Sequence, residues 1–125
     1  MIDAAAFLRL PRASATPPGI VIGPVDDIGR GAVRSYVVDL GDARFHGLIW
    51  RRDDEVAGFV DRCPHAGLPL ARQIDDYLSP DGSLIVCAWH GALFDWSGAC
   101  VGGPAGGSRL AQWPVAVRDG MLVTT

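Results

Sequence analysis

Two short motifs in this chain each pair a thiol with an imidazole. They are Cys63-Pro-His65 and Cys87-Ala-Trp-His90, and both lie in stretches rich in glycine and proline. Thiolate sulfur is a soft metal ligand, while imidazole nitrogen suits zinc, copper, iron and nickel. The four side chains Cys63, His65, Cys87 and His90 are therefore predicted to bind one metal centre.

The order of the donors favours an iron–sulfur cluster over zinc. A structural zinc site uses the same donor types, two cysteines and two histidines. In the common zinc finger, however, the second pair consists of two histidines on a helix. Here each pair mixes the two residue types and lies in a loop, so that each loop can serve both irons of a cluster. A structural zinc module is kept as an alternative.

The predicted strands explain how two distant motifs meet. Strand-like runs at residues 57–62 and 84–87 precede the two motifs, and each motif then enters a turn, at 66–69 and at 91–92. Two hairpin tips that point the same way would bring the four donors to one site. The glycines at these tips would let backbone N–H groups approach the cluster closely.

The rest of the chain is also typical of antiparallel β-structure. The strand before the first motif belongs to a longer run at 55–62, and further strands are expected at 33–40, 43–51, 113–118 and 121–124, with turns at 41–42, 53–54 and 119–120. Asp119-Gly120 is the strongest of these turn signals, since both residues tolerate a positive φ. Between the ligand motifs we expect a short helical turn near 70–77 and a turn at 79–82. The prediction is an all-β protein with few helices.

The amino-terminal residues differ in composition from the rest of the chain. Residues 1–19 contain three prolines among alanine, serine and threonine. They suggest a short helix near 4–10, in a segment that wraps the domain or frays. We therefore divide the chain into an extension, 1–19, and one compact domain, 20–125.

The ligand spacing resembles that of the Rieske family. It reads C-x-H, then 21 residues, then C-x-x-H, and residues 87–98 are similar to the second cluster-binding loop of Rieske ferredoxins. Residues 102–105 resemble the proline-containing loop that covers the cluster, and the likeness extends over about residues 30–125. The resemblance implies a Rieske-like antiparallel β-sandwich with a small cluster-binding subdomain. It also implies a [2Fe–2S] cluster, with Cys63 and Cys87 on one iron and His65 and His90 on the other.

The same resemblance predicts a low reduction potential. Rieske proteins of respiratory cytochrome bc complexes place serine and tyrosine hydroxyls near the cluster, and donors of this kind stabilise its reduced form. In this chain Ala92 and Phe94 stand at those positions, and Leu68 and Trp89 replace the cysteine pair that bridges the respiratory loops. We expect a potential toward the negative end of the Rieske range, which runs from about −150 to +300 mV.

The histidine count bears on function. Ring-hydroxylating oxygenases add a mononuclear iron bound by two histidines and a carboxylate. The chain has three histidines, so only His46 is left after His65 and His90 are assigned. The resemblance then implies a ferredoxin, not itself an enzyme, that carries single electrons from a flavin-dependent reductase to a terminal oxygenase through transient complexes. The alternative is the small subunit of an assimilatory NAD(P)H nitrite reductase, whose partner is the large subunit.

Composition and charge exclude other classes of protein. A net charge of −3 and a pI near 5.4 argue against a nucleic-acid partner, because phosphate neutralisation needs clustered cations. No apolar run approaches the roughly 20 residues of a membrane span, and no signal peptide is evident, so a cytoplasmic protein without a membrane partner is expected. His46 is interpreted as structural, and Cys100 as a small buried thiol. Trp89, Phe94 and Trp96 are expected to pack around the cluster.

Overall fold

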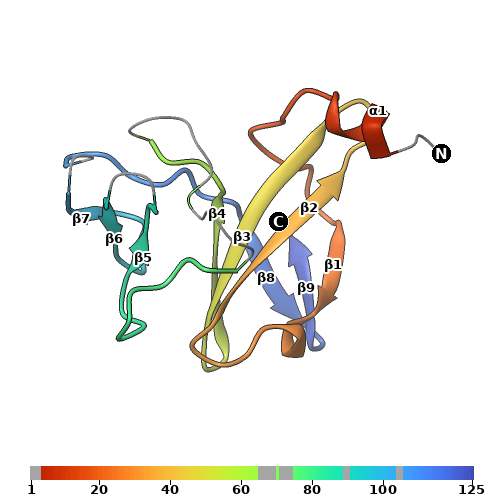
Figure 1. Ribbon diagram of the computed structural model, residues 1–125. Coiled ribbons are helices and arrows are strands. Elements are labelled where there is room, and N and C mark those ends of the chain that lie inside the picture. Colours follow the sequence, from red (N-terminus) through yellow and green to blue (C-terminus); the bar gives the residue numbers. More distant parts are fainter. Residues whose placement is uncertain (1–3, 65–69, 71–74, 89–90, 104–105) are drawn as a thin grey trace.

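The computed structural model describes residues 4–64, 70, 75–88, 91–103 and 106–125. The described chain forms one short helix, α1 (Ala4–Leu8), one 3-10 turn, η1 (Val25–Asp27), and three antiparallel sheets of three strands each. The sheets lie side by side as three layers (Figure 1). The all-β antiparallel architecture expected from the sequence is confirmed.

The middle layer is the sheet β2-β3-β4, formed by β2 (Val33–Asp39), β3 (Arg44–Arg52) and β4 (Glu55–Val60). Its register pairs Val33 with Trp50 and Gly47 with Val60. The turn between β3 and β4 is the one predicted, and Asp53 adopts a φ of 51° there. These three strands begin and end within about two residues of their expected positions.

The second layer is the sheet β1-β9-β8, formed by β1 (Val21–Pro24), β8 (Val115–Arg118) and β9 (Met121–Thr124). The predicted tight turn at 119–120 joins β8 to β9, and Asp119 has a φ of 52°. Backbone hydrogen bonds from Trp113 N–H to the Gly58 carbonyl (2.9 Å) and from Val60 N–H to the Ala111 carbonyl (2.8 Å) connect the segment before β8 to β4. The middle layer and the second layer are thus joined along β4.

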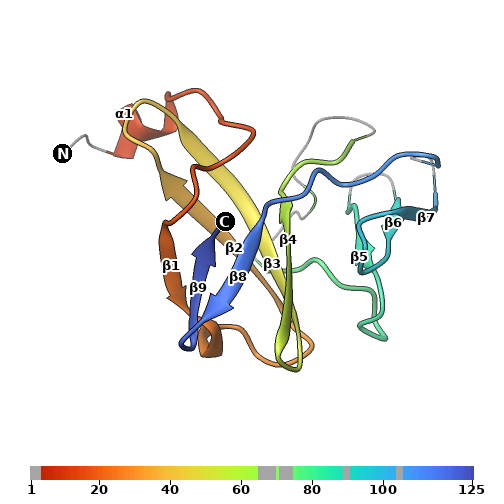
Figure 2. The same ribbon diagram turned by 180° about the vertical axis from the view of Figure 1, so that it is seen from behind.

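The third layer is a small sheet, β5-β6-β7, formed by β5 (Ile85–Val86), β6 (Leu93–Phe94) and β7 (Cys100–Gly102). Figure 2 shows it standing apart from β1, β8 and β9, on the other side of the middle layer. The strand expected at 84–87 is shortened to two residues, and β1, β6 and β7 were not predicted. Strands this short carry too few alternating residues for a period to be recognised.

Strands β3 and β4 of the middle sheet have buried residues on both faces, because the other two layers cover them. On one face of β3 and β4, Phe45, Ile49 and Val60 join a core with Trp113 and Leu122. On the other face lie residues of a second core, which extends into the small sheet: Leu48, Trp50, Phe59, Ile85 and Phe94. The two cores alternate along β3 with the period of two that a strand imposes.

The amino-terminal segment wraps the sheets, which is one of the two arrangements expected for it. Ala13 N–H donates to the Arg44 carbonyl (2.7 Å), and Arg44 N–H donates to the Pro11 carbonyl (2.9 Å). Further along, the Thr16 hydroxyl accepts a hydrogen bond from the Trp113 indole N–H (2.9 Å). The segment is therefore fixed to β3 and to the stretch that leads into β8. Within the described residues, none of the helices is long and apolar enough to cross a membrane.

Candidate iron–sulfur centre

Cys63 and Cys87 lie at the ends of two different strands and share one core. Cys63 follows β4, and Cys87 follows β5; both side chains are fully buried and belong to the core that contains Leu70 and Ile85. None of the three cysteines forms a disulfide. The structure therefore brings the two predicted sulfur donors into one water-excluded region. His65 and His90 lie outside the described residues.

Aromatic side chains connect this region to the middle sheet. Phe94 is fully buried in the same core as both cysteines, as expected. Trp96 is half-buried, and its ring meets that of Trp50 edge to face with centroids 5.1 Å apart. The guanidinium of Arg52 lies 4.2 Å from the centre of the Trp96 ring. Trp89, the third aromatic residue expected here, lies outside the described residues.

Backbone hydrogen bonds hold together the two ends of the turn that contains the second motif. Cys87 N–H donates to the Ala92 carbonyl (2.8 Å), and Gly91 N–H donates back to the Cys87 carbonyl (2.8 Å). Ala88 N–H donates to the carbonyl of Leu70, at the end of the first loop (2.7 Å). These bonds fix the backbone on both sides of Trp89 and His90 without using a side chain.

Gly103 brings a third segment against this turn. Its φ is +84°, and a Cβ atom at this position would lie 2.7 Å from both the Ala92 Cα and the Gly91 carbonyl oxygen. Real Cβ atoms do not approach backbone this closely, so the contact requires glycine. The segment predicted to cover the cluster therefore packs directly on the second ligand turn, although Pro104 and Ala105 are outside the described residues.

We predict that Gly103→Ala weakens the site. The added methyl group must push the 102–103 backbone away from Ala92, and alanine is strained at a positive φ, which costs about 1–2 kcal/mol. Purified Gly103→Ala should lose iron to a chelator several times faster than the wild type. Gly107→Ala is the matched control, because Gly107 has a similar φ of +83° but nothing within 4 Å of its Cβ position. Equal rates of iron loss in the two variants would contradict the packing argument.

Asp61 is a buried residue beside the first motif that the sequence motifs did not reveal. The residue is 8% exposed, and its carboxylate accepts two hydrogen bonds, from Leu70 N–H (2.9 Å) and from the Tyr77 hydroxyl (2.7 Å). Its backbone N–H donates to the His46 carbonyl (3.0 Å). Burial, together with the negative charge and hydrogen bond of Asp61, raises the pKa of Tyr77 far above its usual value, so that Tyr77 stays protonated and donates.

The position of Asp61 in the chain lets it connect the two ends of the first ligand loop. It stands two residues before Cys63, and both of its side-chain partners come from beyond the first motif. Asp61 therefore ties the start of the first ligand loop to its end. Only its spacing, D-x-C-x-H at the end of a strand, could have drawn attention to it in the sequence.

The segment between the two motifs is also fixed to β2. Asp75, at a φ of 62°, accepts hydrogen bonds from the backbone N–H (2.7 Å) and the hydroxyl (3.0 Å) of Ser35. These bonds use an N–H group of β2, an outer strand of its sheet. The helical turn expected near 70–77 falls mostly outside the described residues.

Two residues that were not assigned as ligands have clear local partners. His46 Nε2 lies 3.1 Å from Arg44 Nη1, which can only donate, so this nitrogen accepts and the ring is neutral. Burial lowers the pKa of His46, as do the charges of Arg12 and Arg44. The structural interpretation of His46 agrees with this geometry. Cys100 was expected to be buried but is half-buried, because it lies on the short strand β7. Its thiol donates to the Gly102 carbonyl (3.1 Å).

The comparison with protein families agrees with this arrangement. The model of the Rieske [2Fe–2S] domain matches residues 19–114, which include both ligand motifs and every strand except β8 and β9. The chain belongs to the Rieske [2Fe–2S] domain family. The cofactor of this Rieske domain is accordingly a [2Fe–2S] cluster. A comparison with curated proteins gave no match.

Solved structures share the fold of this Rieske domain. The ferredoxin of carbazole 1,9a-dioxygenase from Nocardioides aromaticivorans IC177 is 18% identical with a TM-score of 0.66, over 87% of this chain and 98% of that one. A ferredoxin of Sphingomonas yanoikuyae B1 is 22% identical with a TM-score of 0.62, over 85% and 96%. The terminal oxygenase of the Nocardioides system is also similar, at 22% identity and a TM-score of 0.66, over 89% of this chain but only 30% of that one.

The described residues fit the sulfur half of a Rieske centre. Cys63 and Cys87 supply two buried thiols, surrounded by apolar side chains that keep water away. Among the described residues, no three histidine, cysteine or acidic side chains are grouped closely enough to bind a metal ion, and the two predicted nitrogen ligands lie outside that set.

Proposed function

We propose that this protein is a Rieske-type ferredoxin that carries single electrons from a flavin-dependent reductase to a terminal oxygenase. We assign Cys63, His65, Cys87 and His90 as the cluster ligands. The observation that carries the proposal is the burial of Cys63 and Cys87 in one core, at the ends of two strands of a Rieske domain.

The lengths of the matched chains support a role as an electron carrier. This chain covers nearly the whole length of two ferredoxins, but less than a third of an oxygenase chain. One solved structure of similar fold, at 23% identity and a TM-score of 0.65, is a complex of reduced oxygenase and oxidised ferredoxin in carbazole 1,9a-dioxygenase. Residues 20–125 correspond to the electron-carrying domain in this proposal, and residues 1–19 to its extension.

The chain's own residues have three tasks in such a carrier. When bound, the cluster accepts and releases one electron at a time. The buried thiols of Cys63 and Cys87 would hold one iron, and the core around Phe94 excludes water from that side. The backbone bonds of the 87–92 turn and the Asp61 carboxylate hold the two ligand loops in place before and after electron transfer.

Reconstitution tests the proposed route. The purified protein should contain equal amounts of iron and acid-labile sulfide, and reduction should give the electron paramagnetic resonance signal of a Rieske centre. It should then support turnover of a ring-hydroxylating oxygenase supplied with NADH and a flavin-dependent reductase. A protein that accepts electrons but couples only to a nitrite reductase large subunit would establish the alternative function.

We predict a low reduction potential for the cluster. Ala92 and Phe94, the residues at the positions of the respiratory hydroxyls, are both fully buried and offer no side-chain hydrogen bond to the cluster sulfurs. Cyclic voltammetry should give a potential of about −150 mV, the negative end of the Rieske range, because hydrogen bonds to sulfur raise the potential and these two side chains supply none. A clearly positive potential would contradict this assignment of the two positions.

A further inference from the structure

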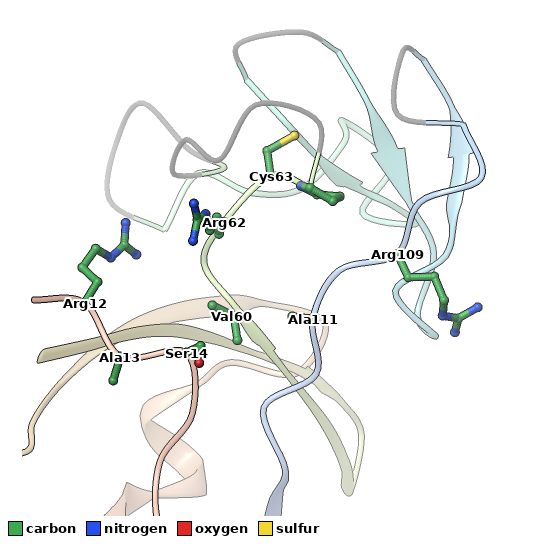
Figure 3. A pocket seen from close by; sticks show the side chains of 9 residues that line it. Arg12, Ala13, Ser14, Val60, Arg62, Cys63, Arg109 and Ala111 are labelled. Carbon is green, nitrogen blue, oxygen red and sulfur yellow. The ribbon is translucent and has the colours of Figure 1, made fainter. Parts of the chain in front are cut away.

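A cationic cavity lies beside the first ligand loop. It has a volume of about 680 Å³, and its walls come from the amino-terminal segment, the end of β4 and residues 109–111. Its lining includes Arg12, Arg62 and Cys63 itself. In Figure 3 the guanidinium groups of Arg12 and Arg62 lie on the same side of the cavity.

Neither Arg12 nor Arg62 forms an ion pair with another described residue. Both arginines are exposed, and the ion pairs within the described part of the chain involve only Arg34 and Arg51. Arg12 donates one hydrogen bond, to the backbone carbonyl of Asp61 (3.1 Å). The Asp61 carboxylate attracts Arg12, but it is already bound by Leu70 and Tyr77.

Neighbouring charges reinforce the cationic character. Partial desolvation lowers the pKa of Arg12 most, and the positive charges of Arg44 and Arg62 lower it further. Arg109 also lines the cavity, but its guanidinium points away and donates to the Ser97 carbonyl (3.0 Å). The acidic residues of η1 and of the β3–β4 and β8–β9 turns lie at the opposite end of the molecule (Figure 1).

We propose that this cavity docks carboxylate side chains on the surface of a redox-partner protein. The proposal rests on the proposed function and adds the chemistry of the partner: an acidic patch, recognised by Arg12 and Arg62 although the ferredoxin itself has a net charge of −3. Guanidinium groups bind carboxylates through paired, charge-assisted hydrogen bonds. A local field of this kind also orients an incoming partner, so that its cofactor faces the loop carrying Cys63.

The first test measures binding without electron transfer. Isothermal titration calorimetry of the oxidised holoprotein with a short poly-glutamate peptide should show binding at low salt, and Arg62→Glu should weaken it about tenfold or more. Arg118→Glu is the matched control, because Arg118 is also exposed but lies at the end of β8, away from the cavity. Equal weakening by both variants, or no binding to the wild type, would overturn the proposal.

A competition experiment distinguishes a docking site for a protein surface from a binding site for a small anion. Free glutamate, added at the same carboxylate concentration, should not displace the peptide, because its carboxylates are not linked to those of further residues and gain no effective concentration from them. Displacement by free glutamate would show a small-anion site and overturn docking by a protein.

The second test measures electron transfer with small inorganic oxidants. Stopped-flow oxidation of the reduced protein by ferricyanide, an anion, should slow down as salt is added, although the net charge of −3 predicts the opposite. Arg62→Glu should lower the rate at low salt at least about threefold, whereas Arg118→Glu should have a much smaller effect. Oxidation by tris-phenanthroline cobalt(III), a cation, should respond to Arg62→Glu in the opposite direction.

The two tests also distinguish this inference from the proposed function. Iron and sulfide content and the resonance spectrum establish the carrier independently of charge. A protein with a normal cluster whose ferricyanide rate rises with salt, and in which Arg62→Glu resembles Arg118→Glu, would overturn the docking site alone.

Discussion

Replacement of Cys63 by serine is expected to abolish the cluster. The thiolate is the metal ligand, and a serine hydroxyl is far less acidic and binds iron poorly. The position is also fully buried, so the variant would bury an extra polar group in the core beside Leu70 and Ile85. Purified Cys63→Ser should contain less than about a tenth of the wild-type iron and give no Rieske resonance signal on reduction.

The third cysteine provides the control for this experiment. Cys100 is half-buried on β7, and its thiol donates to a neighbouring carbonyl, a bond that serine can replace. Cys100→Ser should therefore retain its iron, its colour and its resonance signal. A cluster that survives Cys63→Ser, or one that is lost in Cys100→Ser, would show that the ligand assignment is wrong.

Removal of the Asp61 carboxylate is expected to destabilise the protein by several kcal/mol. Asp61→Ala leaves Leu70 N–H and the Tyr77 hydroxyl without their acceptor in a buried site, at about 1–3 kcal/mol for each donor. A total loss of about 3 kcal/mol would lower the apparent unfolding temperature by about 10 °C. Thermal unfolding of the oxidised holoprotein, recorded at one scan rate, measures this shift.

Two further variants test whether the loss of stability comes from the buried Asp61 carboxylate and its hydrogen bonds. Tyr77→Phe removes one donor and should cost only about 1 kcal/mol, and in the double variant with Asp61→Ala the losses should be less than additive. Asp39→Ala is the control for a solvent-exposed carboxylate, because Asp39 accepts one exposed hydrogen bond, from Gly41 N–H (2.8 Å). Equal losses for Asp39→Ala and Asp61→Ala would contradict the role of Asp61 in tying the first ligand loop.

The effect of Asp61 should also be visible at the cluster. Because the carboxylate ties residues on both sides of the first motif, its loss should broaden or shift the resonance signal and speed the release of iron. A merely structural role, distant from the ligands, would lower the unfolding temperature without changing the spectrum.

The sequence by itself determined the local features of this protein. The two cysteines and the turns at 53–54 and 119–120 could be located from residue types over a few positions, because turns and strands depend on local backbone preferences. The strands β2, β3, β4 and β9 followed from the same signals. The burial of Cys63 and Cys87 in one core agrees with the expected convergence of two strand ends.

The tertiary structure alone decided which distant residues support the site. Asp61 meets Tyr77 across 16 residues, and Arg12 reaches the Asp61 carbonyl across 49, so no short window of sequence contains either pair. The contact of Gly103 with the second ligand turn and the cavity beside Cys63 likewise depend on segments that meet only after the three sheets have packed. Spacing indicates which side chains can bind a metal, whereas packing between layers determines what holds those side chains in place and which charges surround them.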